Sequence, residues 1–98
     1  YGGVGADSIS GESGDDTIKG NNGSDTLNGG NGEDSIMGGG GNDTVNGGPG
    51  DDYIFGGVGD DTIDAGPGVD LILGGTGTDS CFDVDIDLPG RRQDCEAF

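Results

Sequence analysis

The chain has 98 residues, enough for one domain at most, and it contains 26 glycines, two tyrosines, three phenylalanines and no tryptophan. This composition excludes an ordinary packed globule. The formal net charge of -17 excludes nucleic acid as a natural partner and disfavours direct binding to an anionic membrane. No apolar run approaches the ~20 residues of a transmembrane helix. A cation is the natural partner for so many carboxylates.

Nine copies of a nine-residue unit, G-G-x-G-x-D-x-U-x with U aliphatic, occupy residues 2–82. The copies begin at Gly2, Gly11, Gly20, Gly29, Gly38, Gly47, Gly56, Ala65 and Gly74. The fourth position is always glycine, and the sixth is always aspartate: Asp7, Asp16, Asp25, Asp34, Asp43, Asp52, Asp61, Asp70 and Asp79. A disordered chain needs no such register, so the strict period predicts a repeat architecture.

Each repeat is predicted to form a six-residue turn followed by a three-residue strand. The glycines supply turn conformations closed to other residues, and the strand triplets are rich in β-branched side chains. With two repeats per winding, the chain would form a flattened parallel coil with the eighth positions inside. One inner row would be Ile9, Leu27, Val45, Ile63 and Cys81, and the facing row Ile18, Ile36, Ile54 and Ile72.

The aspartates would then stack in two columns, each joining residues eighteen apart. Bare carboxylates at the strand spacing of about 4.8 Å repel one another, and nine small apolar side chains make a thin core. Calcium takes six to eight oxygen ligands, which aspartates and the carbonyls of glycine-rich turns can supply. We expect about seven ions, with four between Asp7, Asp25, Asp43, Asp61 and Asp79 and three between Asp16, Asp34, Asp52 and Asp70. Without a cation we expect the chain to be unfolded.

Other acids and the two cysteines have separate predicted roles. The fifth-position acids Asp15, Glu33, Asp51 and Asp60 are expected to face solvent rather than bind metal. We predict that Cys81 and Cys95 form a disulfide, which would pin residues 83–98 as a cap over the open end of the coil. A core thiol and a separate surface thiol are the alternative.

The nonapeptide resembles the RTX (repeats-in-toxin) calcium-binding repeat over residues 2–82. The resemblance implies an all-β fold, a parallel β-roll that is a right-handed two-sheet β-solenoid. It also implies a secreted or cell-surface bacterial protein that folds on meeting calcium outside the cell, with the nine aspartates and turn carbonyls as ligands. Glu12 and Asn21 replace the second glycine and Ala65 the first, so their turns depart from the pattern. The two cysteines depart from the near absence of cysteine in RTX proteins exported by type I secretion.

The outward strand positions predict a surface patch. Tyr53, Phe55, Leu71 and Leu73 would form a contiguous apolar patch on one sheet, while the other sheet is uniformly polar. Either the tail, in which Val84, Ile86 and Leu88 alternate with aspartates, folds onto the patch, or another chain docks there. The first coil has an open edge, where further coils or a second molecule would pair.

A calcium-binding structural module without enzymatic activity is the main functional hypothesis, because no catalytic constellation is visible in the sequence. Two alternatives remain open: the C-terminal module of a secreted hydrolase or toxin with catalysis upstream of Tyr1, and an assembly module of an adhesin, surface layer or filament.

Overall fold

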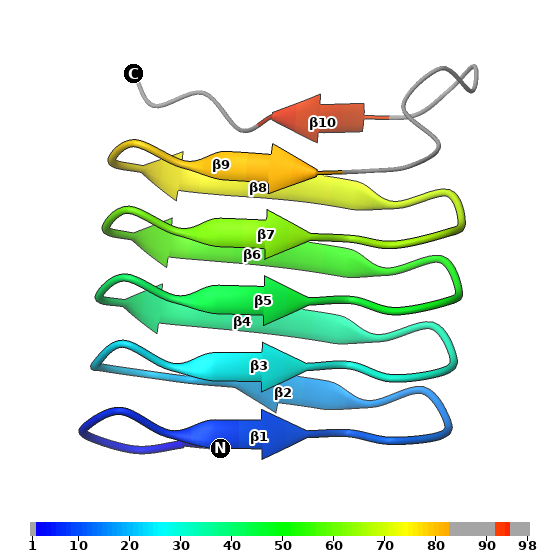
Figure 1. The fold of residues 1–98 in the computed structure, drawn as a ribbon, viewed down its shortest axis with the longest axis horizontal. Helices are drawn as coiled ribbons and strands as arrows, with labels where there is room; N and C mark the ends of the chain where they lie inside the picture. The colour runs from blue at the N-terminus through cyan, green and yellow to red at the C-terminus, as the bar shows by residue number, and fades with distance from the viewer. Residues whose placement is uncertain (1, 83–91, 95–98) are drawn as a thin grey trace.

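The computed structural model describes residues 2–82 and 92–94, which form ten strands and no helix. The strands make two parallel five-stranded sheets (Figure 1). The first sheet contains β1 (Ser8–Ser10), β3 (Thr26–Asn28), β5 (Thr44–Asn46), β7 (Thr62–Asp64) and β9 (Ser80–Phe82). The second contains β2 (Thr17–Lys19), β4 (Ser35–Gly40), β6 (Tyr53–Val58), β8 (Leu71–Thr76) and β10 (Arg92–Asp94).

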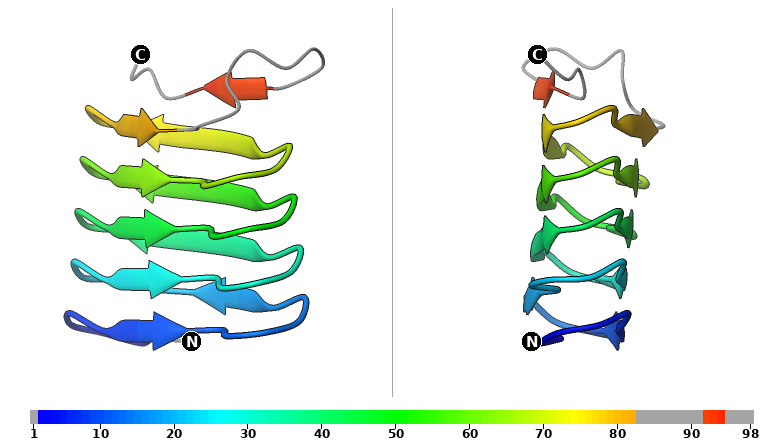
Figure 2. Two further views of the ribbon diagram at one scale, coloured as in Figure 1. Left: turned by 45° about the vertical axis from the view of Figure 1, so that its right-hand side comes forward. Right: turned by 90° about the vertical axis from the view of Figure 1, so that its left-hand side faces the viewer.

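Successive strands alternate between the two sheets, so each winding of the coil uses two repeats. In Figure 1 the chain runs to the right along the nearer sheet and to the left along the farther one while it rises, which makes the coil right-handed. The two layers are seen edge-on in Figure 2. We call the edge formed by the turns of the odd-numbered repeats the odd edge, at the left of Figure 1, and the opposite one the even edge.

The register confirms the two predicted inner rows. Ile9 pairs with Leu27 and Leu27 with Val45 in one sheet, and Ile36 pairs with Ile54 in the other. The fully or almost fully buried apolar side chains are Ile18, Leu27, Ile36, Val45, Ile54, Ile63, Ala65 and Ile72, and Ile9 and Cys81 pack against them. Apart from Ala65, the apolar core is therefore built from one eighth-position side chain per repeat.

The predicted division into six turn and three strand residues is wrong for β4, β6 and β8. These strands have six residues, because they continue through the first three positions of the next repeat. There Gly39 pairs with Gly57 and Gly40 with Val58, so the ladder runs into the odd edge. At the even edge Pro49 and Pro67 stand at the third position, and proline has no N–H to extend a ladder.

The outer faces of the sheets differ as the sequence predicts. The first sheet exposes its seventh and ninth positions, such as Thr44 and Asn46. On the second sheet, Tyr53 and Phe55 are 49% and 38% exposed, and they pair with the half-buried Leu71 and Leu73. The apolar patch is therefore contiguous, while its occupant stays a prediction.

The described part of the tail is β10, which pairs with β8 in parallel and extends the second sheet at its upper edge. Val84, Ile86, Leu88 and Cys95 lie outside the described residues. The Cys81–Cys95 disulfide, and the cap formed by residues 83–98, therefore stay predictions. The part of the chain that the structure describes has no helix long and apolar enough to cross a membrane.

Candidate metal centre

The nine predicted aspartates lie at the two edges, each directly before a strand. Positions six and eight of a repeat face the same way because side chains alternate along an extended chain, so these aspartates point inward beside the apolar row. The six in the middle of the stack are at most 3% exposed: Asp25, Asp34, Asp43, Asp52, Asp61 and Asp70. Asp7, Asp16 and Asp79, at the ends of the stack, are half-buried. The structure therefore brings the aspartates together in the two expected columns.

One oxygen of each stacked aspartate binds the coil before it. Oδ1 of Asp43, for example, accepts a hydrogen bond of 2.8 Å from the backbone N–H of Asp25. The other bonds join Asp7 to Asp25, Asp16 to Asp34, Asp34 to Asp52, Asp43 to Asp61, Asp52 to Asp70 and Asp61 to Asp79, all at 2.8–2.9 Å. This ladder fixes the orientation of the carboxylates.

The second oxygen, Oδ2, is different. It is buried and has no hydrogen-bond partner within the described residues in Asp7, Asp16, Asp25, Asp34, Asp43, Asp52, Asp61 and Asp79. An unsatisfied buried polar atom costs about 1–3 kcal/mol, and more if it is charged. Buried carboxylates therefore need either a proton or a cation, and this requirement recurs in coil after coil.

The first-position glycine leaves no room for a side chain next to Oδ2. A methyl group built on Gly38 would lie 2.5 Å from Oδ2 of Asp43 and 2.6 Å from the carbonyl oxygen of Gly56 in the next coil. The same two neighbours, Oδ2 of the repeat's own aspartate and a carbonyl oxygen of the next coil, lie 2.5–2.9 Å from the built methyl in seven repeats. These repeats begin at Gly2, Gly11, Gly20, Gly29, Gly38, Gly47 and Gly56. The Oδ2 atom and the carbonyl oxygen thus lie near each other in these repeats, and both are oxygen ligands of the kind that calcium takes.

The aspartate columns carry closely spaced, buried carboxylates, which a bound cation would stabilise. The pKa of Asp52 is raised to about 7, chiefly by burial; the hydrogen bond with the Asp34 backbone lowers it, and the nearby carboxylates of Asp70, Asp34 and Asp51 add to the rise. Burial likewise raises the pKa of Asp61 to about 6. The pKa values of Asp34 and Asp43 are also raised, chiefly by burial. A cation at Oδ2 would stabilise the charged carboxylates and so lower these pKa values.

The donor set suits a hard cation such as calcium. No group of three or more histidine, cysteine, aspartate or glutamate side chains that could hold a metal occurs among the residues that the structure describes. An ion would therefore need backbone carbonyls as well as carboxylates, all of them oxygen ligands of the type that calcium prefers. Carbonyls of the second and fourth turn positions also face the next coil, since a methyl built on Gly41 would collide with the carbonyl oxygen of Gly23.

The fifth position has a role that the sequence did not reveal. Asp15, Glu33, Asp51 and Asp60 are exposed, as predicted. Oδ1 of Asp15, Asn42, Asp51 and Asp60 accepts the N–H of the fifth residue in the next coil, at 2.8 Å. These bonds point opposite to those of the sixth position. The recurrence of Asp and Asn at the fifth position was the sequence feature that could have indicated these hydrogen bonds between coils.

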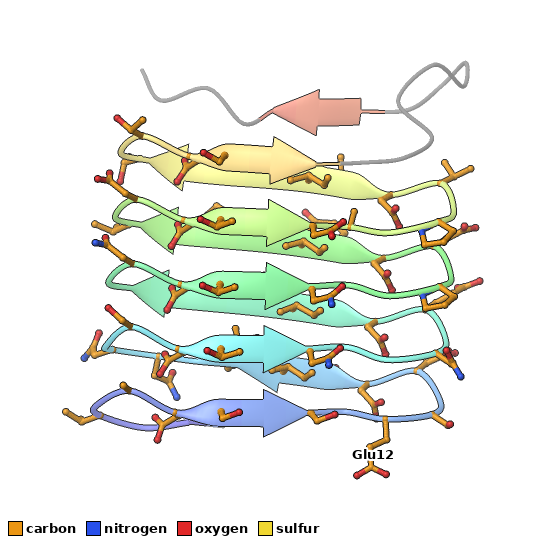
Figure 3. All side chains as sticks on the ribbon, in the orientation of Figure 1. Glu12 is labelled. Carbon is orange, nitrogen blue, oxygen red and sulfur yellow. The ribbon has the colours of Figure 1, made fainter. Side chains whose placement is uncertain are left out.

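The two replaced second-position glycines keep the glycine conformation. Glu12 and Asn21 have φ angles of 75° and 72°, in the left-handed region that favours glycine. The side chain of Glu12 points away from the stack at its first coil (Figure 3). Their carbonyl groups still accept hydrogen bonds from Asn31 and Gly40 in the next coil, so both turns remain in register.

Comparison with known families agrees with this geometry. Four overlapping matches to the family model of the RTX calcium-binding nonapeptide repeat cover residues 1–36, 19–54, 29–63 and 46–81. Comparisons with curated proteins and with solved structures gave no match.

Proposed function

Because the chain belongs to the family of RTX calcium-binding nonapeptide repeats, we propose that it is a structural module that winds into its β-roll when calcium binds between the coils. Seven ions lie between successive coils, in the seven repeats where the aspartate Oδ2 and a carbonyl oxygen of the next coil both lie close to the first-position glycine. The ligands are the nine sixth-position aspartates together with turn carbonyls. The buried Oδ2 atoms that have no hydrogen-bond partner among the described residues are the observation that carries this proposal.

The chain's own residues explain the dependence on calcium. The apolar core has little more than one side chain per repeat, while the backbone must be ordered over about eighty residues at roughly 1–2 kcal/mol each. Each ion offsets the charge of buried carboxylates and joins one coil to the next. At a free calcium concentration about 100-fold above the dissociation constant, each independent site adds about 2.7 kcal/mol of stability.

The proposal extends to the setting in which the module works. A switch of this kind is useful where a chain must stay unfolded at low calcium and fold at high calcium, as in export from a bacterial cell to its surroundings. The dense negative charge, which disfavours folding without a counter-ion, supports this setting. No chemistry beyond binding is assigned to these residues.

A calcium titration of the chelator-treated chain tests the proposal. Far-ultraviolet circular dichroism should show β structure appearing with calcium and disappearing with chelator, and calorimetry should count close to seven ions. Magnesium at the same concentration is the control, because its short octahedral bonds fit a carbonyl-rich site poorly. A chain that is equally folded with and without calcium would refute the proposal.

A further inference from the structure

The two edges of the roll differ in how the third turn position is bonded. At the odd edge, the N–H of Gly40 donates a 2.9 Å hydrogen bond to the carbonyl oxygen of Asn21 in the coil before it. In the lowest pair of even-edge turns, the N–H of Asn31 donates a 2.8 Å bond to the carbonyl oxygen of Glu12. The third-position N–H therefore binds the second-position carbonyl of the preceding coil.

Two prolines remove this bond in the upper half of the even edge. Pro49 and Pro67 have no N–H, so the carbonyl oxygens of Gly30 and Gly48 cannot receive the hydrogen bond that Glu12 and Asn21 receive. The turns nevertheless stay stacked, because the N–H of Gly32 still donates to the Pro49 carbonyl, and that of Gly50 to the Pro67 carbonyl, both at 3.1 Å. We call the contact between two stacked turns of successive coils a gap. In each of these two gaps, the proline leaves one carbonyl oxygen without its hydrogen-bond donor, and the turns stay equally close.

The released oxygens face the coil above. The Gly30 oxygen lies where it would collide with a methyl built on Gly48, and the Gly48 oxygen lies 2.9 Å from a methyl built on Gly66. Each lies in the same even-edge gap as a buried carboxylate of the lower coil, Asp34 or Asp52. These two gaps therefore hold one more oxygen without a competing donor than the gap below them.

We propose that Pro49 and Pro67 create two calcium sites of higher affinity at the even edge, with the carbonyl oxygens of Gly30 and Gly48 as additional ligands. This inference depends on the proposed function, because it concerns ions bound between coils. It divides the seven sites into two tight ones, which fill first, and five weaker ones. Winding would then begin at the even edge of the fourth to eighth repeats.

The chain offers a matched exchange to test this inference. Asn31 occupies the position two repeats below Pro49, and the glycines before Asn31, Pro49 and Pro67 have φ angles of 90°, 88° and 82°. Pro49→Asn restores an N–H for the Gly30 carbonyl, and Asn31→Pro removes the one on the Glu12 carbonyl. Val58→Asn is the control: Val58 is an exposed third-position residue at the odd edge, whose N–H is retained.

Calorimetric calcium titration of the whole chain should give two tight ions for the wild type, one for Pro49→Asn and three for Asn31→Pro. The affected site should change by about two- to tenfold in affinity, which is the range that corresponds to one hydrogen bond. Val58→Asn should match the wild type. If the wild type binds no calcium, the proposed function fails as well.

Equal numbers of tight ions in the wild type and both variants, with calcium still bound, would overturn only this inference. A proline that acts only by stiffening the chain gives that result, since it shifts stability by about 0.4–1 kcal/mol with or without calcium. Circular dichroism at saturating calcium verifies that each variant winds. Asn31→Pro decides the matter if Pro49→Asn does not wind.

Discussion

Oδ1 of Asp43 accepts the backbone N–H of Asp25 at 2.8 Å, while Oδ2 of the same carboxylate is buried without a hydrogen-bond partner in the described chain. One oxygen thus holds the previous coil and the other is left for a ligand. The two carboxylate oxygens have these separate roles along both edges. It makes the carboxylate charge, rather than the side-chain shape, the feature that links folding to a cation.

Replacing Asp43 by asparagine separates these two roles. The amide oxygen can still accept the Asp25 N–H, but the charge and one carboxylate oxygen are lost. We expect at least one fewer bound ion and a higher calcium midpoint for folding, measured by calorimetry and circular dichroism. Asp60→Asn is the matched control, because Asn42 already makes the same fifth-position bond one coil earlier. An Asp43→Asn protein with the wild-type ion count would contradict the assignment.

Gly38→Ala should disrupt one proposed calcium site. The added methyl would lie 2.5 Å from Oδ2 of Asp43 and 2.6 Å from the Gly56 carbonyl oxygen, so it would displace two proposed ligands of one ion. We expect loss of one ion and a lower melting temperature in calcium, with overpacking alone costing about 1–3 kcal/mol.

Gly40→Ala is the control for this variant. Its methyl would meet only Oδ1 of Asn22 at 3.3 Å, and Gly40 does not have a positive φ angle. It should therefore keep the full ion count. Equal calcium binding by the two alanine variants would contradict the proposal that Asp43 Oδ2 and the Gly56 carbonyl oxygen bind an ion.

The raised pKa values predict opposite pH effects without and with calcium. In the calcium-free chain, the folded pKa of Asp52 is about 7 and that of Asp61 about 6, above the value of about 3.9 for unfolded aspartate. Their contribution to stability is therefore fully present below about pH 4 and is lost as the pH rises through 6 to 7. The β signal in the circular dichroism of the calcium-free protein should therefore increase as the pH falls from 8 to 5.5, a range that lies above its pI of about 4.1.

With calcium the trend reverses, because protons compete for the same carboxylates. The calcium midpoint should rise as the pH falls from 8 to 5.5, and binding near pH 6.5 should release protons. Titrations in two buffers of different ionisation enthalpy measure that release. A midpoint independent of pH in this range would contradict the carboxylate assignment.

The predicted Cys81–Cys95 disulfide is tested by thiol counting and by reduction. We expect no reactive thiol in the oxidised protein and a loss of about 3 kcal/mol on reduction, the typical value for a loop of this length. Denaturant unfolding at saturating calcium gives the measurement, with the Cys81→Ser and Cys95→Ser double variant as a control that reduction should not change. One free thiol per cysteine in the untreated protein would show that the disulfide does not form.

The period of nine was enough to predict the coil, the register and both aspartate columns, because the same positions of every repeat point their side chains inward or outward. It could not predict the direction of the hydrogen bonds made by Asp43 and Asp60, since both directions satisfy the same spacing. Nor did the period indicate that β4, β6 and β8 continue into the odd edge. That difference depends on backbone N–H groups at the third position, which Pro49 and Pro67 lack and Val58 has.

A crystal structure of the calcium-loaded protein, with anomalous scattering recorded to locate calcium, tests the central claim most directly. We predict seven anomalous peaks between successive coils, four along the odd edge and three along the even edge, each beside an aspartate Oδ2 and a first-position glycine. The same β-roll with no peak between its coils would contradict the account.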